Sequence, residues 1–140
     1  MFDKTVTIYN YQKIDKVEKW QRTVLDGVSI HYSIEKAVGE NGIVKRTQIL
    51  TVVIPEDVAA DGRRYIDHRQ YAKLKDTSRY WTINPSDNLD VIVADYCRQE
   101  ITDEYRVKDL KADFTKCGTI CGFQDNTDEM FLKHYEVVCK

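Results

Sequence analysis

The chain has 140 residues, of which 42% are hydrophobic and 31% charged, a composition that excludes a disordered protein and fits one folded domain. Its 21 basic and 23 acidic residues give a net charge of −2, which argues against a protein that binds nucleic acid through a broad basic face. The longest apolar run, Ile49–Ile54, is far shorter than the ~20 residues that a membrane-spanning helix needs. Residues 1–5 show no secretory signal pattern, so we expect a cytosolic protein with reduced thiols and no membrane contact.

The first third of the chain is predicted to form a series of β-strands. Thr5–Tyr9 alternates between apolar and polar side chains, as a half-buried strand does. Residues 10–19 have no period and are interpreted as a turn or as the loop of a wide hairpin. Trp20–Leu25 is the next expected strand, and Asp26-Gly27 is a strong hairpin signal before a third strand at Val28–Ile34.

A fourth strand is expected after the Asn41-Gly42 turn, from about residue 45 to residue 54. It ends at Pro55, which cannot donate a hydrogen bond to a neighbouring strand. Its last six residues are nearly all apolar, so we expect a central strand that is covered on both faces.

The segment from about residue 55 to residue 80 differs in character and is expected to leave the sheet as a long excursion. It is polar and rich in turn residues, and Asp67 precedes a run with helical spacing. An aspartate in that position is a good helix N-cap, so we expect one short helix over His68–Leu74.

The chain after the excursion is predicted to return to β-structure. Residues 97–101 are expected to continue the sheet after a break, and residues 103–114 to form a loop with one helical turn. The remaining extended segments are Tyr80–Ile83, Leu89–Ala94, Cys117–Phe123 and Tyr135–Cys139. The chain is therefore expected to be mainly β, a small antiparallel β-barrel or sandwich with one short helix in a long loop, forming a single domain over residues 1–140.

The chain shows no motif of a known catalytic or metal site, so we expect no enzyme, no metal and no cofactor. The spacing of Cys117 and Cys121 would suit zinc, but both lie in a predicted strand and buried thiols explain them better. No Ser or Cys occupies a glycine-flanked nucleophile turn. Two alternatives stay open, a zinc-dependent fold using that pair and a pocket in which Cys97, His134 and nearby carboxylates converge.

The excursion is the most plausible place for contacts with a partner. Gly62 and the two following arginines place two guanidinium groups at its tip, and arginine makes bidentate contacts with phosphates and carboxylates. Aromatic side chains nearby could anchor an interface. The candidate contact residues are Arg63, Arg64, Tyr65, Arg69 and Tyr71.

Five segments, in order along nearly the whole chain, resemble small minor structural proteins from the head–tail gene modules of phages and prophages of Gram-positive bacteria. The segments are Thr5–Asn10, Trp20–Val28, Val52–Pro55, Tyr80–Ile83 with the following Asp87, and His134–Val137. In proteins of this kind the aspartate of the turn that corresponds to Asp87 is often followed by Gly. This chain has Asn88 there.

The resemblance implies a head-closure (stopper) or neck protein without catalytic residues. Such a protein is a small β-barrel that forms a homo-oligomeric ring below the portal and adaptor, keeps DNA in the head and provides a docking surface for tail proteins. DNA would touch it only while passing through the channel, and residues 55–76 would face that channel or a neighbour. The protein would belong to the virion and occupy the host cytoplasm during assembly. The alternatives are a tail-terminator or tail-completion protein and, from another class, a small ligand-binding or hydrolytic β-barrel.

Overall fold

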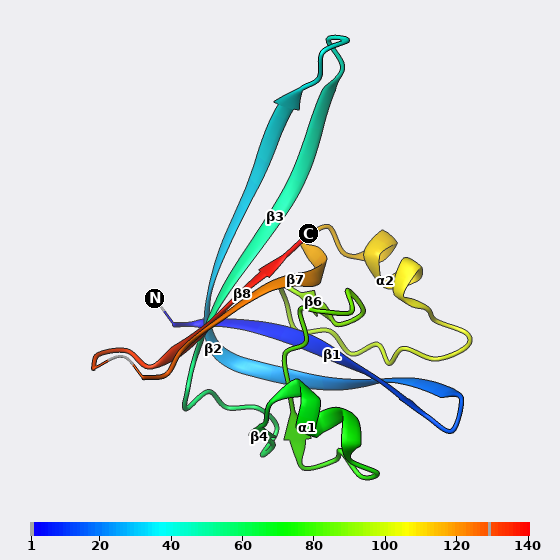
Figure 1. Ribbon diagram of the computed structural model, residues 1–140, viewed down its shortest axis with the longest axis vertical. Helices are drawn as coiled ribbons and strands as arrows, with labels where there is room; N and C mark the ends of the chain where they lie inside the picture. The colour runs from blue at the N-terminus through cyan, green and yellow to red at the C-terminus, as the bar shows by residue number, and fades with distance from the viewer. Residues whose placement is uncertain (1, 129) are drawn as a thin grey trace.

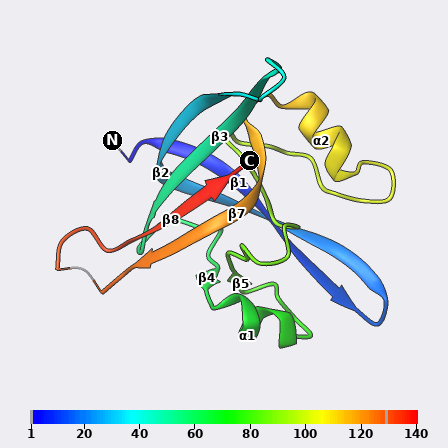
Figure 2. The same cartoon turned by 45° about the horizontal axis from the view of Figure 1, so that its top comes forward.

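A computed structural model describes residues 2–128 and 130–140. Six antiparallel strands follow one another around a barrel in the order β1-β2-β3-β8-β7-β6, and β6 pairs with β1 to complete the cycle (Figures 1 and 2). Their bounds are β1 (Lys4–Ile14), β2 (Val17–Val38), β3 (Val44–Pro55), β6 (Val91–Val93), β7 (Cys117–Asn126) and β8 (His134–Cys139). The prediction of a mainly β, antiparallel barrel is confirmed.

The remaining elements are short and lie outside the barrel. Strands β4 (Arg64–Tyr65) and β5 (Tyr80–Trp81) pair in parallel, and helix α1 (His68–Lys73) lies between them in the chain. Asp67 caps α1 as predicted, because its carboxylate accepts a hydrogen bond from the backbone N–H of Arg69 at 2.8 Å. A second helix, α2 (Val107–Asp113), forms where the sequence indicated only one helical turn.

Residues 97–101, expected as sheet, are in no strand. Side chains from the barrel bond to part of their backbone instead. The backbone N–H of Cys97 donates to the Thr7 hydroxyl at 2.9 Å, and the carbonyl of Gln99 accepts from the Tyr9 hydroxyl at 2.7 Å. These two backbone groups are therefore unavailable to a strand ladder.

The β1–β2 connection is tighter than predicted. Ile14 pairs directly with Val17, so only Asp15 and Lys16 form the turn, and both have positive φ, at 51° and 67°. Two successive left-handed residues define the hairpin turn whose twist matches the flanking strands. Residues expected as a loop are therefore strand up to the turn itself.

Asp26-Gly27, predicted as a hairpin turn, lies instead within the 22-residue strand β2. The register with β1 shifts there, since Lys4 pairs with Val28 but Thr5 pairs with Asp26, and Gly27 has a φ of 95°. An extra left-handed glycine opposite a regular strand is a β-bulge, which bends the strand. The same dipeptide suits a turn or a bulge, so the local signal was right about the backbone conformation and wrong about the topology.

The bulge lies where β2 changes partner and leads into a projecting hairpin. β2 pairs with β1 up to Val28 and with β3 from Ser29 onward, while β8 accompanies β3 only from Leu50 to Pro55. Residues 33–49, named here the arm, consequently extend beyond the other strands, and Figure 1 shows them as the long hairpin at one end of the molecule.

The prediction that β3 is covered on both faces is wrong. Leu50, Val52 and Ile54 are fully buried, whereas Ile49 and Val53 on the opposite face are partly exposed. The apolar run therefore contains one row of side chains that faces the core and a second row, on the other face of the strand, that is only partly buried.

Two apolar clusters make up the core. The larger fills the barrel; Ala60 from the excursion belongs to it, as do Trp81 and Ile83 just after the excursion. The smaller lies beside α2, where Leu110 packs with Tyr9 and neighbours. None of the helices in the described residues is long and apolar enough to span a membrane.

Candidate functional site

Arg63, the first of the predicted contact residues, is tied to the barrel. One of its terminal guanidinium nitrogens donates to the carbonyl of Arg22 at 2.7 Å and to the hydroxyl of Thr23 at 2.9 Å, and its Nε donates to the carbonyl of Ser78 at 3.0 Å. Asp61 lies 3.9 Å from the same guanidinium. Through these bonds Arg63 holds the excursion against β2.

The two predicted tyrosines also serve packing. Tyr71 is buried, and Tyr65 is half-buried in an aromatic group with Trp81 and Tyr135, whose ring centroids lie 5.3 and 4.4 Å from its own. Burial raises the pKa of both hydroxyls, and that of Tyr135 to about 12. Each tyrosine therefore stays neutral and stabilises the packing of the excursion.

Arg64 and Arg69 are the two predicted residues with exposed side chains. They lie on β4 and α1, at the lower end of the molecule in Figure 1. Of the five candidates, these two have guanidinium groups accessible to a partner.

The excursion as a whole is a fixed cap on the β1–β2 end of the barrel. The side-chain amide of Gln12 donates to the carbonyl of Leu74 at 2.6 Å, and that of Gln21 donates to the carbonyl of Tyr80 at 2.8 Å. The backbone N–H of Asp26 also donates to the carbonyl of Ala59 at 2.9 Å. The sequence contained no sign of these side-chain amides bonding the loop backbone, because each lies in an otherwise regular strand.

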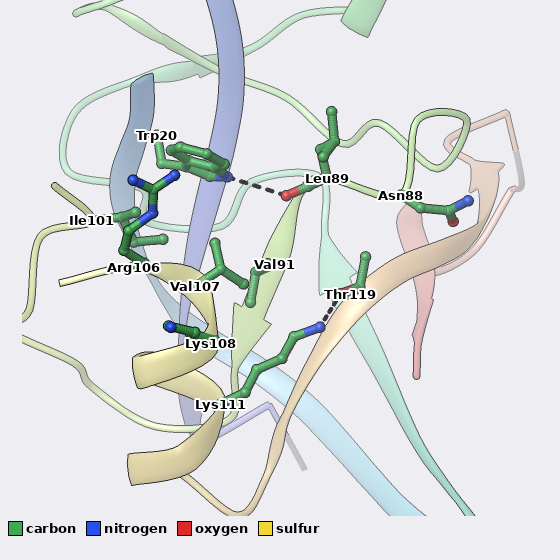
Figure 3. A pocket seen from close by; sticks show the side chains of 10 residues that line it. All are labelled: Trp20, Asn88, Leu89, Val91, Ile101, Arg106, Val107, Lys108, Lys111 and Thr119. Atoms are coloured by element: carbon green, nitrogen blue, oxygen red, sulfur yellow. Dashed lines mark hydrogen bonds between the residues drawn. The ribbon is translucent and has the colours of Figure 1, made fainter. Parts of the chain in front are cut away.

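A pocket of about 320 Å³ opens between α2, β6 and β7 (Figure 3). Apolar side chains form its inner surface, including buried Val91 and Ile101. The Trp20 indole closes one side, where its Nε1–H donates to the carbonyl of Leu89 at 3.3 Å. The local reason for this arrangement is α2, which begins at Val107 and turns its apolar side toward the barrel.

Three cations surround that apolar surface. Arg106, Lys108 and Lys111 are exposed around the pocket, and Lys111 donates to the Thr119 hydroxyl. The lining residues include no carboxylate, histidine or cysteine. The pocket can therefore hold an acidic group with an apolar part, such as a side chain of a bound protein.

Asp90, which the sequence places beside Asp87 in one of several carboxylate pairs, is a deeply buried ionisable group. Asp90 accepts hydrogen bonds from the backbone N–H groups of Tyr11 (2.9 Å) and Asn84 (3.2 Å) and from the Asn10 amide (2.9 Å). Burial raises its pKa from 3.8 to about 6 against these favourable contacts. The carboxylate joins β1 to the start of β6, and its three partners belong to the backbone and a side-chain amide, which suits a structural role.

The alternative catalytic residues lie apart. Cys97 is buried in the cluster beside α2, whereas His134 lies at the start of β8, where it contacts the Asn126 amide at 3.1 Å. The four cysteines are free thiols, and burial raises the pKa of Cys117 to about 11. Within residues 2–128 and 130–140, no group of three or more His, Cys, Asp or Glu side chains could hold a metal ion.

The fold and these sites together define a small antiparallel β-barrel protein with a fixed cap, a basic pocket and a projecting arm. The chain belongs to the family described as a family of unknown function, DUF6751, whose match covers residues 1–140. No curated protein and no solved structure is significantly similar to it.

Proposed function

We propose that this chain is a structural protein of the phage head–tail interface. In this role it assembles as a ring below the portal and adaptor, closes the DNA-filled head and provides the surface on which the tail docks. The resemblance of five ordered sequence segments motivates the proposal, and the arm is the observation that carries it. A hairpin that projects from a small barrel with exposed apolar side chains costs solubility unless a protein surface covers it.

The chemistry of the remaining surface supports a binding role. The thiol of Cys117 has little thiolate at neutral pH because its pKa is raised, and the pocket beside α2 suits an acidic protein group. A net charge of −2 would let DNA leave through a channel without being held by extensive phosphate neutralisation. Arg64 and Arg69 remain the candidates for contact with DNA or with a neighbour.

The deciding experiment deletes the gene in the phage or prophage that encodes this chain. We expect particles with heads that package DNA, lose it and lack tails, and we expect the chain supplied in trans to restore tailed particles. Intact infectious particles from the deletion strain would refute the proposal.

Co-purification distinguishes the two positions within the particle. A head-closure protein should be recovered with the portal and adaptor from tailless heads, whereas a tail-completion protein should be recovered with tail tubes made without heads. Recovery with tubes alone would assign the chain to the tail and overturn the head-closure position.

A further inference from the structure

Most large exposed hydrophobic side chains in the described residues form two separate groups. Those of the arm are 52–72% exposed, namely Ile34, Val38, Ile43 and Val44. Those of the β7–β8 connection are 50–88% exposed, namely Met130, Phe131 and Leu132. Side chains of this size are seldom left to water in such groups unless another protein covers them.

The arm presents its apolar residues on one face together with positive charge. Ile34 pairs with Gln48, Lys36 with Arg46, and Val38 with Val44, so these six side chains point to the same side of the hairpin. The next pair inward on this face is Tyr32 with Leu50, and Leu50 is buried in the barrel. The core-facing row therefore continues onto the arm, where it carries two cations and no acidic residue.

The β7–β8 connection borders a groove with negative charge. The groove has a volume of about 520 Å³ and is lined by Pro55, Glu56, Asp57, Leu132 and Lys133. The backbone N–H of Glu56 donates to the carbonyl of Lys133 at 2.9 Å, which joins its two walls. Asp128 is exposed on the same connection, and Asp125 is exposed near the end of β7. Together with Glu56 and Asp57 they outnumber Lys133, the one cation among the described residues that line the groove.

The two surfaces lie at opposite ends of one strand. Val44, at the start of β3, belongs to the arm, while Pro55, at its end, pairs with His134, which follows the β7–β8 connection. In Figures 1 and 2 the arm and the connection accordingly project in different directions. The chain cannot fold its own arm onto its own groove without breaking the β3 ladder.

We propose that the arm of one copy binds the groove beside the β7–β8 connection of a second copy. The apolar face of the arm covers Phe131 and Leu132, and Lys36 and Arg46 face Glu56 and Asp57. Because each copy carries both surfaces, the contact is heterologous and repeats from copy to copy, which yields a closed ring when the rotation closes. The inference rests on the ring assembly proposed above and names the surfaces that form it.

Sedimentation of the purified full-length chain over a range of concentrations tests the contact. We expect self-association that weakens as salt is raised, because part of the attraction is between exposed charges. Val38→Ser/Val44→Ser in the arm and Met130→Ser/Phe131→Ser in the connection should each weaken association by about tenfold or more, as interface anchors do. Val17→Ser is the matched control, since Val17 is 65% exposed at the end of the other hairpin, and it should change nothing.

Mixing the two double variants separates this contact from other modes of association. The arm variant keeps an intact groove and the connection variant keeps an intact arm, so the mixture should form a one-to-one heterodimer although neither variant associates alone. Circular dichroism and thermal melts establish that both remain folded. A monomer at every concentration, or association that survives in both variants, would overturn the proposal.

The outcomes also separate this inference from the proposed function. A monomeric chain whose deletion still gives leaking, tailless heads would refute the contact between copies and leave the head–tail role standing. Binding of the arm to purified portal or adaptor in place of a second copy would likewise refute it. Intact tailed particles from the deletion strain, with self-association through these surfaces, would instead remove the head–tail role alone.

Discussion

Replacing Asp90 by asparagine should change how the stability of the protein depends on pH. The carboxylate is 1% exposed and is held by three hydrogen-bond donors, yet burial raises its pKa from 3.8 to about 6. The folded state therefore binds a proton between pH 6 and pH 3.8 that the unfolded state does not bind. By linkage, the contribution of this group to the free energy of unfolding increases as the pH falls through that window.

The size of the effect follows from the shift in pKa. A shift of about two pKa units corresponds to about 3 kcal/mol of unfolding free energy at 1.36 kcal/mol per unit. The protein regains most of this free energy as the pH falls to 4. Above pH 6 the native state carries the full cost of the buried charge. Below pH 3.8 the cost is gone, since both states are then protonated.

Denaturant unfolding of the native chain and of Asp90→Asn, from pH 7.5 down to pH 4, measures this contribution. The difference in unfolding free energy between the two proteins should move by about 2 kcal/mol in favour of the native chain. Asp103→Asn removes an exposed carboxylate and should show no such trend, which controls for the other acidic groups. A difference that stays constant with pH would refute the reasoning, as would an NMR titration of the Asp90 carboxyl carbon with a midpoint near that of an exposed aspartate.

Three further substitutions or measurements test individual features of the fold. Arg63→Ala should destabilise the protein by about 2–4 kcal/mol, because the charge-assisted hydrogen bonds of the guanidinium are lost. Proteolysis within residues 55–80 should become faster as well. Unchanged stability and unchanged proteolysis would contradict the anchoring role of Arg63. Lys16→Gly should stabilise the β1–β2 turn by about 1 kcal/mol, since Lys16 adopts a left-handed conformation that glycine adopts freely. Lys13→Gly on the adjacent strand should destabilise instead, and equal effects at both positions would argue against the turn. A thiol reagent should modify one cysteine of the native protein rapidly, the exposed Cys121, and the remaining thiols only on unfolding; rapid modification of all four would show that the core is open.

The strand pattern and most of the turns could be predicted from the sequence because they depend on neighbouring residues. Alternation of side chains set the strands at Thr5–Tyr9 and Tyr135–Cys139, and Asp67 set the start of α1. The Asn41-Gly42 signal correctly marked the turn at the tip of the arm. These features follow from backbone preferences that act within a few residues.

The candidate contact residues show where local reasoning stops. Two adjacent arginines, Arg63 and Arg64, look equivalent in the sequence, but they lie in different environments in the fold. Arg63 meets the carbonyl of Arg22 and the hydroxyl of Thr23 from β2, whereas Arg64 is exposed. The partner that distinguishes them comes from a strand about forty residues away, so no local pattern could have separated the two.

The sequence by itself determined the class of fold, the strand alternation and the backbone conformation at Gly27, because each depends on side-chain volume, φ preference and period. The tertiary structure alone decided that Gly27 is a bulge, that Asp90 is buried and that an apolar row continues past the barrel onto the arm. The physical reason is that burial and pairing are properties of the surfaces that meet. The sequence pattern at Ile34 and Val38 would be the same whether protein or water lay against these side chains. Only the structure shows that both are exposed and that β8 pairs with β3 no further than Leu50.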